Sequence, residues 1–169
     1  MTVSLVLTCI GPDKPGLVES LSDTVAAHGA NWEKSRMAHL AGQFAGILQV
    51  DVPRDLAEPL IRALRGLDDL GLEVTVQRGD VTQESLRILR LELTGNDRPG
   101  IVREVSRVLA SQGANVEELR TECVNAAMTG GTLFQATAEI GVSEELDIED
   151  LREDLEKLSD EIMVDITLE

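Results

Sequence analysis

Apolar residues recur with two different periods along the first half of the chain. Residues 3–10 alternate in polarity, with Leu5, Leu7 and Cys9 on one face, which indicates a half-buried strand. Residues 15–28 carry apolar side chains at helical spacing instead. On the same criteria, the first half contains strands over residues 3–10, 30–38, 44–52 and 72–76, and helices over residues 15–28 and 56–70.

The second half of the chain repeats this order. Its pattern predicts strands over residues 86–94, 114–123, 133–142 and 161–168, and helices over residues 99–112 and 147–160. Each half is therefore βαββαβ, the order of the ferredoxin-like fold, with both helices on one face of an antiparallel sheet. The predicted fold class is α+β, with two tandem ferredoxin-like domains over residues 1–79 and 86–169 and a linker over 80–85.

Several residues mark where the helices are expected to begin. Pro15 fits the first helical position, where a missing N–H costs nothing. Asp55 and Asp147 each precede a segment with helical periodicity and are predicted to be N-caps. The helix after Asp55 is predicted to turn five apolar side chains inward: Leu60, Ile61, Leu64, Leu67 and Leu70.

Two loops nearly repeat each other in sequence. The first covers Gly11–Val18 (GPDKPGLV) and the second Gly95–Val102 (GNDRPGIV). A Gly-Ala-Asn triplet follows each loop, ending at Asn31 and at Asn115. The second loop lies 84 residues after the first, and the second triplet also lies 84 residues after the first. A shared offset of two separated motifs indicates duplication of one structural unit.

Composition and charge exclude some classes of function. The formal net charge of −16 opposes binding to phosphate backbones, and aromatic residues, which stack on single strands, are only 2% of the chain. No direct nucleic-acid contact is expected. Both cysteines, Cys9 and Cys123, are predicted to be buried and reduced. No segment has the length and apolarity of a membrane span or a signal sequence, so the expected location is cytoplasmic.

The repeated loops have a chemistry suited to a zwitterion. Each leads into a helix N-terminus, where free N–H groups and the helix dipole stabilise a carboxylate or phosphate. Gly16 and Gly100 permit a close approach to the backbone. Asn31 and Asn115 supply carboxamides that donate and accept hydrogen bonds. The alternative is that each loop only forms a turn that starts a helix, and that the aspartate of the loop caps that helix and binds no ligand.

No catalytic, metal or cofactor site is predicted. His28 and His39, the only histidines, have no recognisable nucleophile or carboxylate partner in a catalytic pattern. The two cysteines lack the spacing of a metal-binding or redox motif. The sequence therefore predicts a protein that is not an enzyme.

The two loops, their Gly-Ala-Asn triplets and the βαββαβ order together resemble the ACT domain, a small regulatory module that often binds amino acids. Two such domains spanning the chain without an enzyme resemble the glycine cleavage system transcriptional repressor family. The run Asn31–Met37 (NWEKSRM) resembles a strand of that family. The resemblance implies ligand sites where ACT units meet side by side, and action through a partner regulator rather than on DNA.

Carried over to this sequence, the resemblance implies a ligand-binding set taken from both halves: Asp13, Pro15, Gly16, Leu17, Asn31, Asp97, Pro99, Gly100, Ile101 and Asn115. The halves differ near these positions, because Trp32 is replaced by Val116 and Ser35 by Leu119. Equal binding by the two halves is therefore not required.

Two hypotheses of function follow. The first is a non-enzymatic regulatory protein that senses a small amino acid of the glycine or serine class and acts through a protein partner, as in glycine cleavage system repression. The second is a ligand-free interaction module, or a regulatory subunit of an amino-acid biosynthetic enzyme. In the second, the exposed edge strands that begin at Asn31 and Asn115 are expected to pair with another chain and build a larger sheet. The expected assembly is a homodimer.

Overall fold

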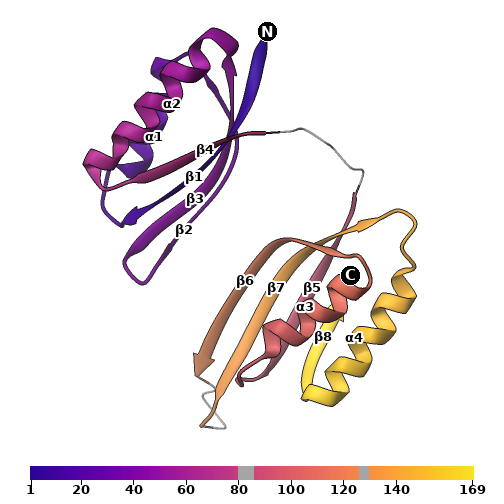
Figure 1. Ribbon diagram of the computed structural model, residues 1–169. Coiled ribbons are helices and arrows are strands. Elements are labelled where there is room, and N and C mark those ends of the chain that lie inside the picture. The colour runs from indigo at the N-terminus through magenta and orange to yellow at the C-terminus, as the bar shows by residue number, and fades with distance from the viewer. Residues whose placement is uncertain (80–85, 126–129) are drawn as a thin grey trace. The chain divides into compact units, whose positions relative to one another are not determined.

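The computed structural model describes residues 1–79, 86–125 and 130–169 (Figure 1). Contacts divide the chain into two compact units, Met1–Thr82 and Gln83–Glu169, and each is described by itself. The predicted linker over 80–85 lies outside the described residues. The domain boundaries therefore remain a prediction.

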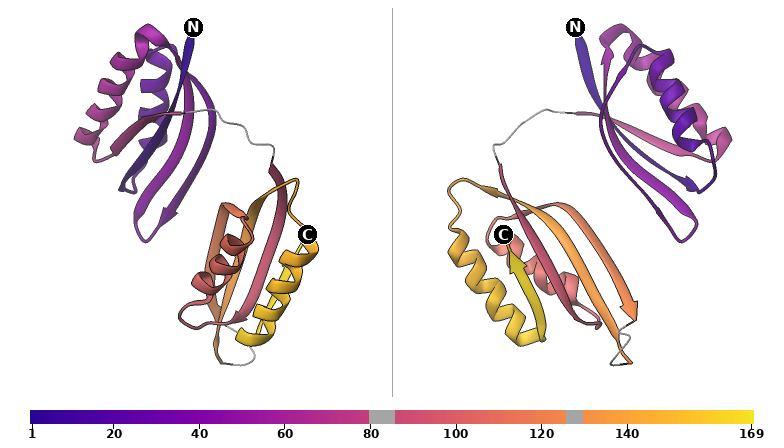
Figure 2. Two further views of the ribbon diagram at one scale, coloured as in Figure 1. Left: turned by 45° about the vertical axis from the view of Figure 1, so that its right-hand side comes forward. Right: turned by 180° about the vertical axis from the view of Figure 1, so that it is seen from behind.

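The first unit is a four-stranded antiparallel sheet with two helices on one face (Figures 1 and 2). Its elements are β1 (Thr2–Pro12), α1 (Leu17–Ala27), β2 (Asn31–Leu40), β3 (Gln43–Pro53), α2 (Ala57–Arg65) and β4 (Glu73–Arg78), with 3₁₀ turns at Arg54–Leu56 and Gly66–Leu70. The strand order is β2-β3-β1-β4, which leaves β2 and β4 at the edges.

The second unit repeats this architecture. Its elements are β5 (Leu86–Asn96), α3 (Ile101–Ser111), β6 (Asn115–Asn125), β7 (Thr132–Ser143), α4 (Ile148–Ile162) and β8 (Val164–Leu168). The strand order is β6-β7-β5-β8, so β6 and β8 are the edge strands. The predicted fold class, two tandem ferredoxin-like units with helices on one face of antiparallel sheets, is confirmed.

Each unit has its own apolar core between helices and sheet. In the first unit, Leu21 of α1 and Leu60 of α2 are fully buried against Leu5 and Leu7 of β1. These are the faces on which the apolar periodicity placed them. Among the described residues, no polar or charged residue is buried. In the same part of the chain, no helix combines the length and apolarity needed to cross a membrane.

The two predicted helix starts in the first unit are wrong. Helix α1 begins at Leu17, one residue after Gly16, and Pro15 belongs to the preceding turn. Helix α2 begins at Ala57, and Asp55 lies in the 3₁₀ turn before it without capping the helix. That turn leads directly into the helix, with Leu56 at the N-cap position instead of Asp55.

Two apolar positions also differ from expectation. Leu70 is 44% exposed, because residues 66–70 form a 3₁₀ turn of about three residues per turn, so the α-helical spacing no longer applies. Cys123 is exposed, whereas Cys9 is buried as predicted. Cys123 lies two residues from the end of edge strand β6, which has a neighbouring strand on one side only.

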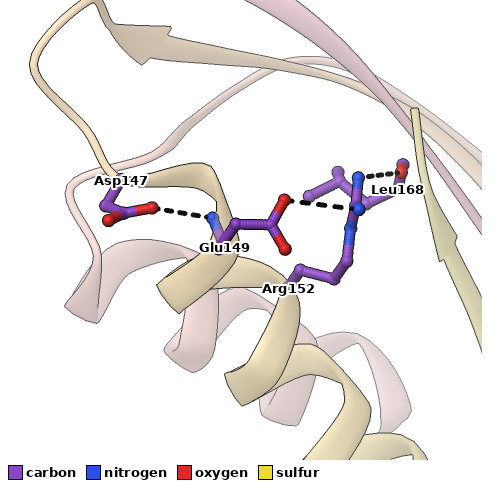
Figure 3. Close-up of polar contacts among 4 residues, drawn as sticks. All are labelled: Asp147, Glu149, Arg152 and Leu168. Atoms are coloured by element: carbon purple, nitrogen blue, oxygen red, sulfur yellow. Dashed lines mark hydrogen bonds and ion pairs between the residues drawn. The ribbon is translucent and has the colours of Figure 1, made fainter.

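The predicted N-cap of α4 is confirmed (Figure 3). The backbone N–H of Glu149 donates to Oδ1 of Asp147 at 2.9 Å. Arg152 extends this contact, since its Nη1 donates to Oε1 of Glu149 at 3.4 Å and its Nη2 to the carbonyl oxygen of Leu168 at 3.3 Å. The start of α4 is thereby connected to the end of β8.

We expect Asp147→Ala to lower the free energy of unfolding by about 0.5–2 kcal/mol, because the Glu149 N–H loses its acceptor. Asp55→Ala is the matched control, since its side chain caps no helix, and should change stability by less than about 0.5 kcal/mol. Urea denaturation followed by circular dichroism measures both. If the two variants lose the same free energy of unfolding, the hydrogen bond between Asp147 and the Glu149 N–H does not stabilise the protein.

Candidate functional site

The two repeated loops present helix N-termini without a side-chain cap. Helix α1 follows Gly16 (φ 92°) and α3 follows Gly100 (φ 98°), and neither helix start has a side-chain cap hydrogen bond. A positive φ is the conformation in which glycine is least strained, which explains both glycines. The first-turn N–H groups of both helices are therefore available to an anion.

Asp13 and Asp97 do not cap the helices that follow them. Their backbone N–H groups donate to the carbonyl oxygens of Gly42 and Thr132, each at 2.9 Å, which holds each loop against the hairpin of its own unit. The alternative in which these aspartates cap their own helices is therefore wrong.

The aspartate side chains instead contact the end of the adjacent edge strand. Oδ2 of Asp13 lies 3.7 Å from Nε2 of His39, and Asp97 accepts a hydrogen bond from the thiol of Cys123. His39 and Cys123 are 84 residues apart, so they occupy the same position in the two units. Loss of hydration, then the charge of Asp97 and its hydrogen bond, raise the pKa of the Cys123 thiol.

Leu17 and Ile101 can contribute only their backbone to a ligand. Both side chains are buried in the core of their unit, at 4% and 2% exposure. The remaining predicted loop residues stay in the turns before the helices: Asp13, Pro15, Gly16, Asp97, Pro99 and Gly100.

Asn31 and Asn115 lie at the opposite end of the sheet from the loops. Asn31 pairs with Asp51 of β3, which pairs with Ser4 near the start of β1, whereas the loop follows Pro12 at the end of β1. The eight-residue separation along β1 corresponds to about 26 Å. The register of the second unit gives the same arrangement for Asn115. A single unit therefore cannot bring its loop and its asparagine to one small ligand.

Each asparagine is bound to a glutamate that sequence reasoning did not select. Nδ2 of Asn31 donates to Oε1 of Glu33 at 2.5 Å, and Nδ2 of Asn115 to Oε1 of Glu117 at 2.6 Å. Both glutamates lie where the edge strand shifts register, which is a β-bulge. Their shared 84-residue offset was the signal that could have identified them.

These asparagine–glutamate pairs leave acceptor atoms for a donor such as an ammonium group. The amide nitrogen is used within the pair, so the asparagine Oδ1 and the second carboxylate oxygen remain available. In the first unit Asp51 lies opposite Asn31, and its buried Oδ1 has no hydrogen-bond partner among the described residues. The asparagine end of each unit therefore favours a cation, and the loop end an anion.

The two units differ along their edge strands on the side that faces the helices. In the first unit, Trp32 and Met37 pack against the core. Val116 and Thr121 replace them in the second unit, where a shallow apolar groove of about 30 Å³ lies between α3 and β6. Among the described residues, no group of three or more potential ligands could hold a metal ion.

Comparison with known proteins identifies the units. The ACT domain family model matches residues 4–77 and 87–169. The UPF0237 protein MK1213 of Methanopyrus kandleri is 34% identical over 86 residues, which cover 49% of this chain and 96% of that protein. Phosphoserine phosphatase SerB2 of Mycobacterium tuberculosis is 28% identical over 130 residues, 70% of this chain and 30% of that protein.

Solved structures agree along the whole chain. A protein of unknown function from Galdieria sulphuraria has a TM-score of 0.85 and 33% identity, covering 100% of this chain and 98% of that one. A provisionally assigned glycine cleavage system transcriptional repressor has the same fold, with a TM-score of 0.73, 17% identity and coverage of 100% and 97%. With one family match in each βαββαβ unit, the chain belongs to the ACT domain family and carries two ACT domains in tandem.

Proposed function

We propose that this protein is a non-enzymatic regulatory protein that senses a small amino acid and acts through a protein partner. The observation that carries the proposal is the separation, in both units, of an anion-favouring loop and a cation-favouring asparagine at opposite ends of one edge strand. A zwitterion needs both groups, so each site requires a second ACT unit.

Antiparallel pairing of edge strands supplies the missing half. When two such edges pair side by side, the start of one strand lies beside the end of the other. Asn31 or Asn115 of one unit then approaches the loop that adjoins the end of its neighbour's strand. The proposed ligand carboxylate binds the amides after Gly16 or Gly100, and its ammonium binds the asparagine Oδ1 with Glu33 or Glu117.

We assign the ligand to the glycine or serine class. The names of two similar proteins, a glycine cleavage system transcriptional repressor and a phosphoserine phosphatase, support this class. The proposed contacts engage the carboxylate and ammonium common to all amino acids, and a small ligand satisfies them without a side-chain pocket.

The partner is proposed to be a transcription regulator or an enzyme, with the protein itself acting as a homodimer. The net charge of −16 opposes direct action on nucleic acid. A cytoplasmic location fits the exposed free thiol of Cys123, because reducing compartments keep such thiols free. Ligand binding at the interface would favour the arrangement of units that binds the ligand more tightly.

One observation favours the ligand-free alternative for the second unit. Nη2 of Arg98 donates to Oε2 of Glu104 at 2.5 Å, so a charged pair joins the loop to the first turn of α3. The first unit has Lys14 and Ser20 at the equivalent positions and lacks this pair. On this reading the second unit serves assembly, as in an interaction module or a regulatory subunit of a biosynthetic enzyme.

Titration calorimetry with the common amino acids tests the proposal. We expect heat for glycine or serine with the native protein, and about 10–100-fold weaker binding for Asn31→Ala, through loss of charge-assisted hydrogen bonds. Asn115→Ala reports separately on the second unit. Gln77→Ala, on the opposite edge strand β4, is the control and should bind normally. Absence of heat for every amino acid with the native protein would leave the ligand-free alternative.

A further inference from the structure

One face of the first sheet has an apolar centre that is exposed to water. Both helices of the first unit lie on one face of its sheet (Figure 2), and we call the opposite face the helix-free face. The register of β1 with β3 brings four apolar residues together on it: Val6, Ile10, Ala45 and Ile47. Ile10 and Ile47 are 50% and 49% exposed. An antiparallel sheet with one face in water normally has polar residues on that face, so the first unit departs from the usual pattern.

The helix-free face of the second unit is polar at the same positions. The four apolar residues are replaced, in the order given, by Arg90, Thr94, Gln135 and Thr137. Glu92 also lies on this face, and it accepts a hydrogen bond from Nε of Arg90 at 2.8 Å. The two units share one architecture, so the fold itself does not require apolar side chains here. Their presence in the first unit indicates a surface that another molecule covers.

Charges of opposite sign flank this apolar centre. The strand order β2-β3-β1-β4 puts β2 at one edge of the sheet and β4 at the other. On the helix-free face, β2 carries Lys34 and Arg36, whereas β4 carries Glu73 beside Thr75 and Gln77. One edge of the face is therefore basic and the other acidic, so the face complements a second copy of itself in one orientation.

That orientation has a twofold axis parallel to the strands, between β1 and β3. It stacks the two sheets face to face, with β1 of each copy over β3 of the other. Ile10 then lies over Ala45, and Thr8 lies over Ile47. The apolar side chains of both copies meet at the centre of the contact and leave water.

The charged edges select this axis over the alternative. With the axis along the strands, β2 of one copy lies over β4 of the other, and Arg36 lies over Thr75 and next to Glu73. An axis across the strands would instead stack β2 on β2 and bring Lys34 and Arg36 of the two copies together. Opposite charges across an interface fix its register, and like charges disfavour it.

The helix-free face of the second unit is a poorer partner for this surface. Its two central strands carry Arg90, Glu92 and Glu139 on that face. Covering the exposed isoleucines with it would take these charges out of water, which costs free energy. A second copy of the first unit therefore fits the surface better.

We propose that two copies of this chain associate through the helix-free faces of their first units, with Ile10 and Ile47 at the centre of a two-layer packing of sheets. The contact uses neither the repeated loops nor the asparagines, and it leaves the backbone edge of β2 accessible. It therefore goes beyond the proposed sensing function and does not depend on amino-acid binding.

Sedimentation velocity of the full chain over a range of concentrations tests the interface. The double variant Ile10→Thr, Ile47→Thr introduces the residues that the second unit has at these positions, so the fold accepts them. It should raise the dissociation constant of the assembly about tenfold or more. If the edge strands also pair, the native protein forms a tetramer and the double variant a dimer. Thr94→Ala with Thr137→Ala, at the equivalent positions of the second unit, is the matched control and should leave the assembly unchanged.

Circular dichroism confirms that each variant is folded. A native protein that stays monomeric at every concentration tested, or a double variant that assembles like the native protein, overturns the proposal, as does an equal loss in the control. Lys34→Glu tests the orientation and should weaken the assembly, because it places an acidic side chain over the edge that carries Glu73. Tighter assembly of Lys34→Glu would mean that β2 faces β2 and would reject the axis along the strands.

Discussion

Leu64→Ala is expected to lower the free energy of unfolding of the first unit by about 2–5 kcal/mol. Leu64 lies in α2 with 0% of its surface exposed and packs within the core of that unit. Alanine would remove one methine and two methyl carbons from this core and leave a cavity that tightly packed neighbours fill only in part. Denaturation by urea, followed by circular dichroism, measures the change.

Leu70→Ala is the matched control for this substitution. Helical periodicity predicted both leucines to point inward, but Leu70 is 44% exposed in the 3₁₀ turn after α2. Its replacement should cost less than about 1 kcal/mol, because much of the side chain already contacts water. If both variants lose a comparable free energy of unfolding, Leu70 must be buried like Leu64. That result would contradict the change from α-helix to 3₁₀ turn at Gly66.

Gly11→Ala is expected to destabilise the first unit by about 1–3 kcal/mol or more. A Cβ at Gly11 would lie 2.2 Å from the carbonyl oxygen of Gly71, which is a backbone atom and cannot move by a change of rotamer. The chain must therefore shift β1 away from the turn before β4. A Cβ at the equivalent Gly95 would clash with the side chain of Val164 of β8, so both copies of the loop begin with a glycine for a steric reason.

Gly66→Ala separates this steric effect from the general effect of adding a methyl group. Gly66 has φ −66°, and a Cβ there would come within 4 Å of no heavy atom beyond its chain neighbours and the backbone of its own helix. Alanine should therefore be neutral or should stabilise the unit by about 0.4–1 kcal/mol, because it restricts the unfolded chain. Thermal denaturation of both variants against the native protein gives the comparison. If Gly11→Ala unfolds no more readily than Gly66→Ala, the close contact with Gly71 is not a constraint.

The two units keep the same loops but have diverged along the edge strands beside them. Gly16 and Gly100 have nearly the same backbone conformation, and both asparagines hold a glutamate at a bulge. By contrast, Trp32 packs against the core of the first unit, whereas Val116 borders an apolar groove in the second. The two units therefore share their polar geometry at the loops and asparagines and differ in their apolar contacts.

Periodicity in the sequence was sufficient for the order of elements. Strands and helices must turn one face to the core, so Leu5 and Leu7 at a period of two, and Leu151, Leu155 and Leu158 at helical spacing, could be assigned without coordinates. Helix ends were harder to assign. Asp147 caps α4 and Asp55 caps nothing, although both stand before apolar-periodic segments, because the 3₁₀ turn after Pro53 displaces the start of α2.

The sequence alone determined the duplication, the βαββαβ order and the candidate residues, because each depends on spacing along one chain. Tertiary structure decided which of those residues meet. It placed Asn31 about 26 Å from its own loop, exposed Cys123 and brought Gly11 against Gly71. These relations depend on strand register and on contacts between distant segments, which the local pattern of apolar and polar residues does not specify.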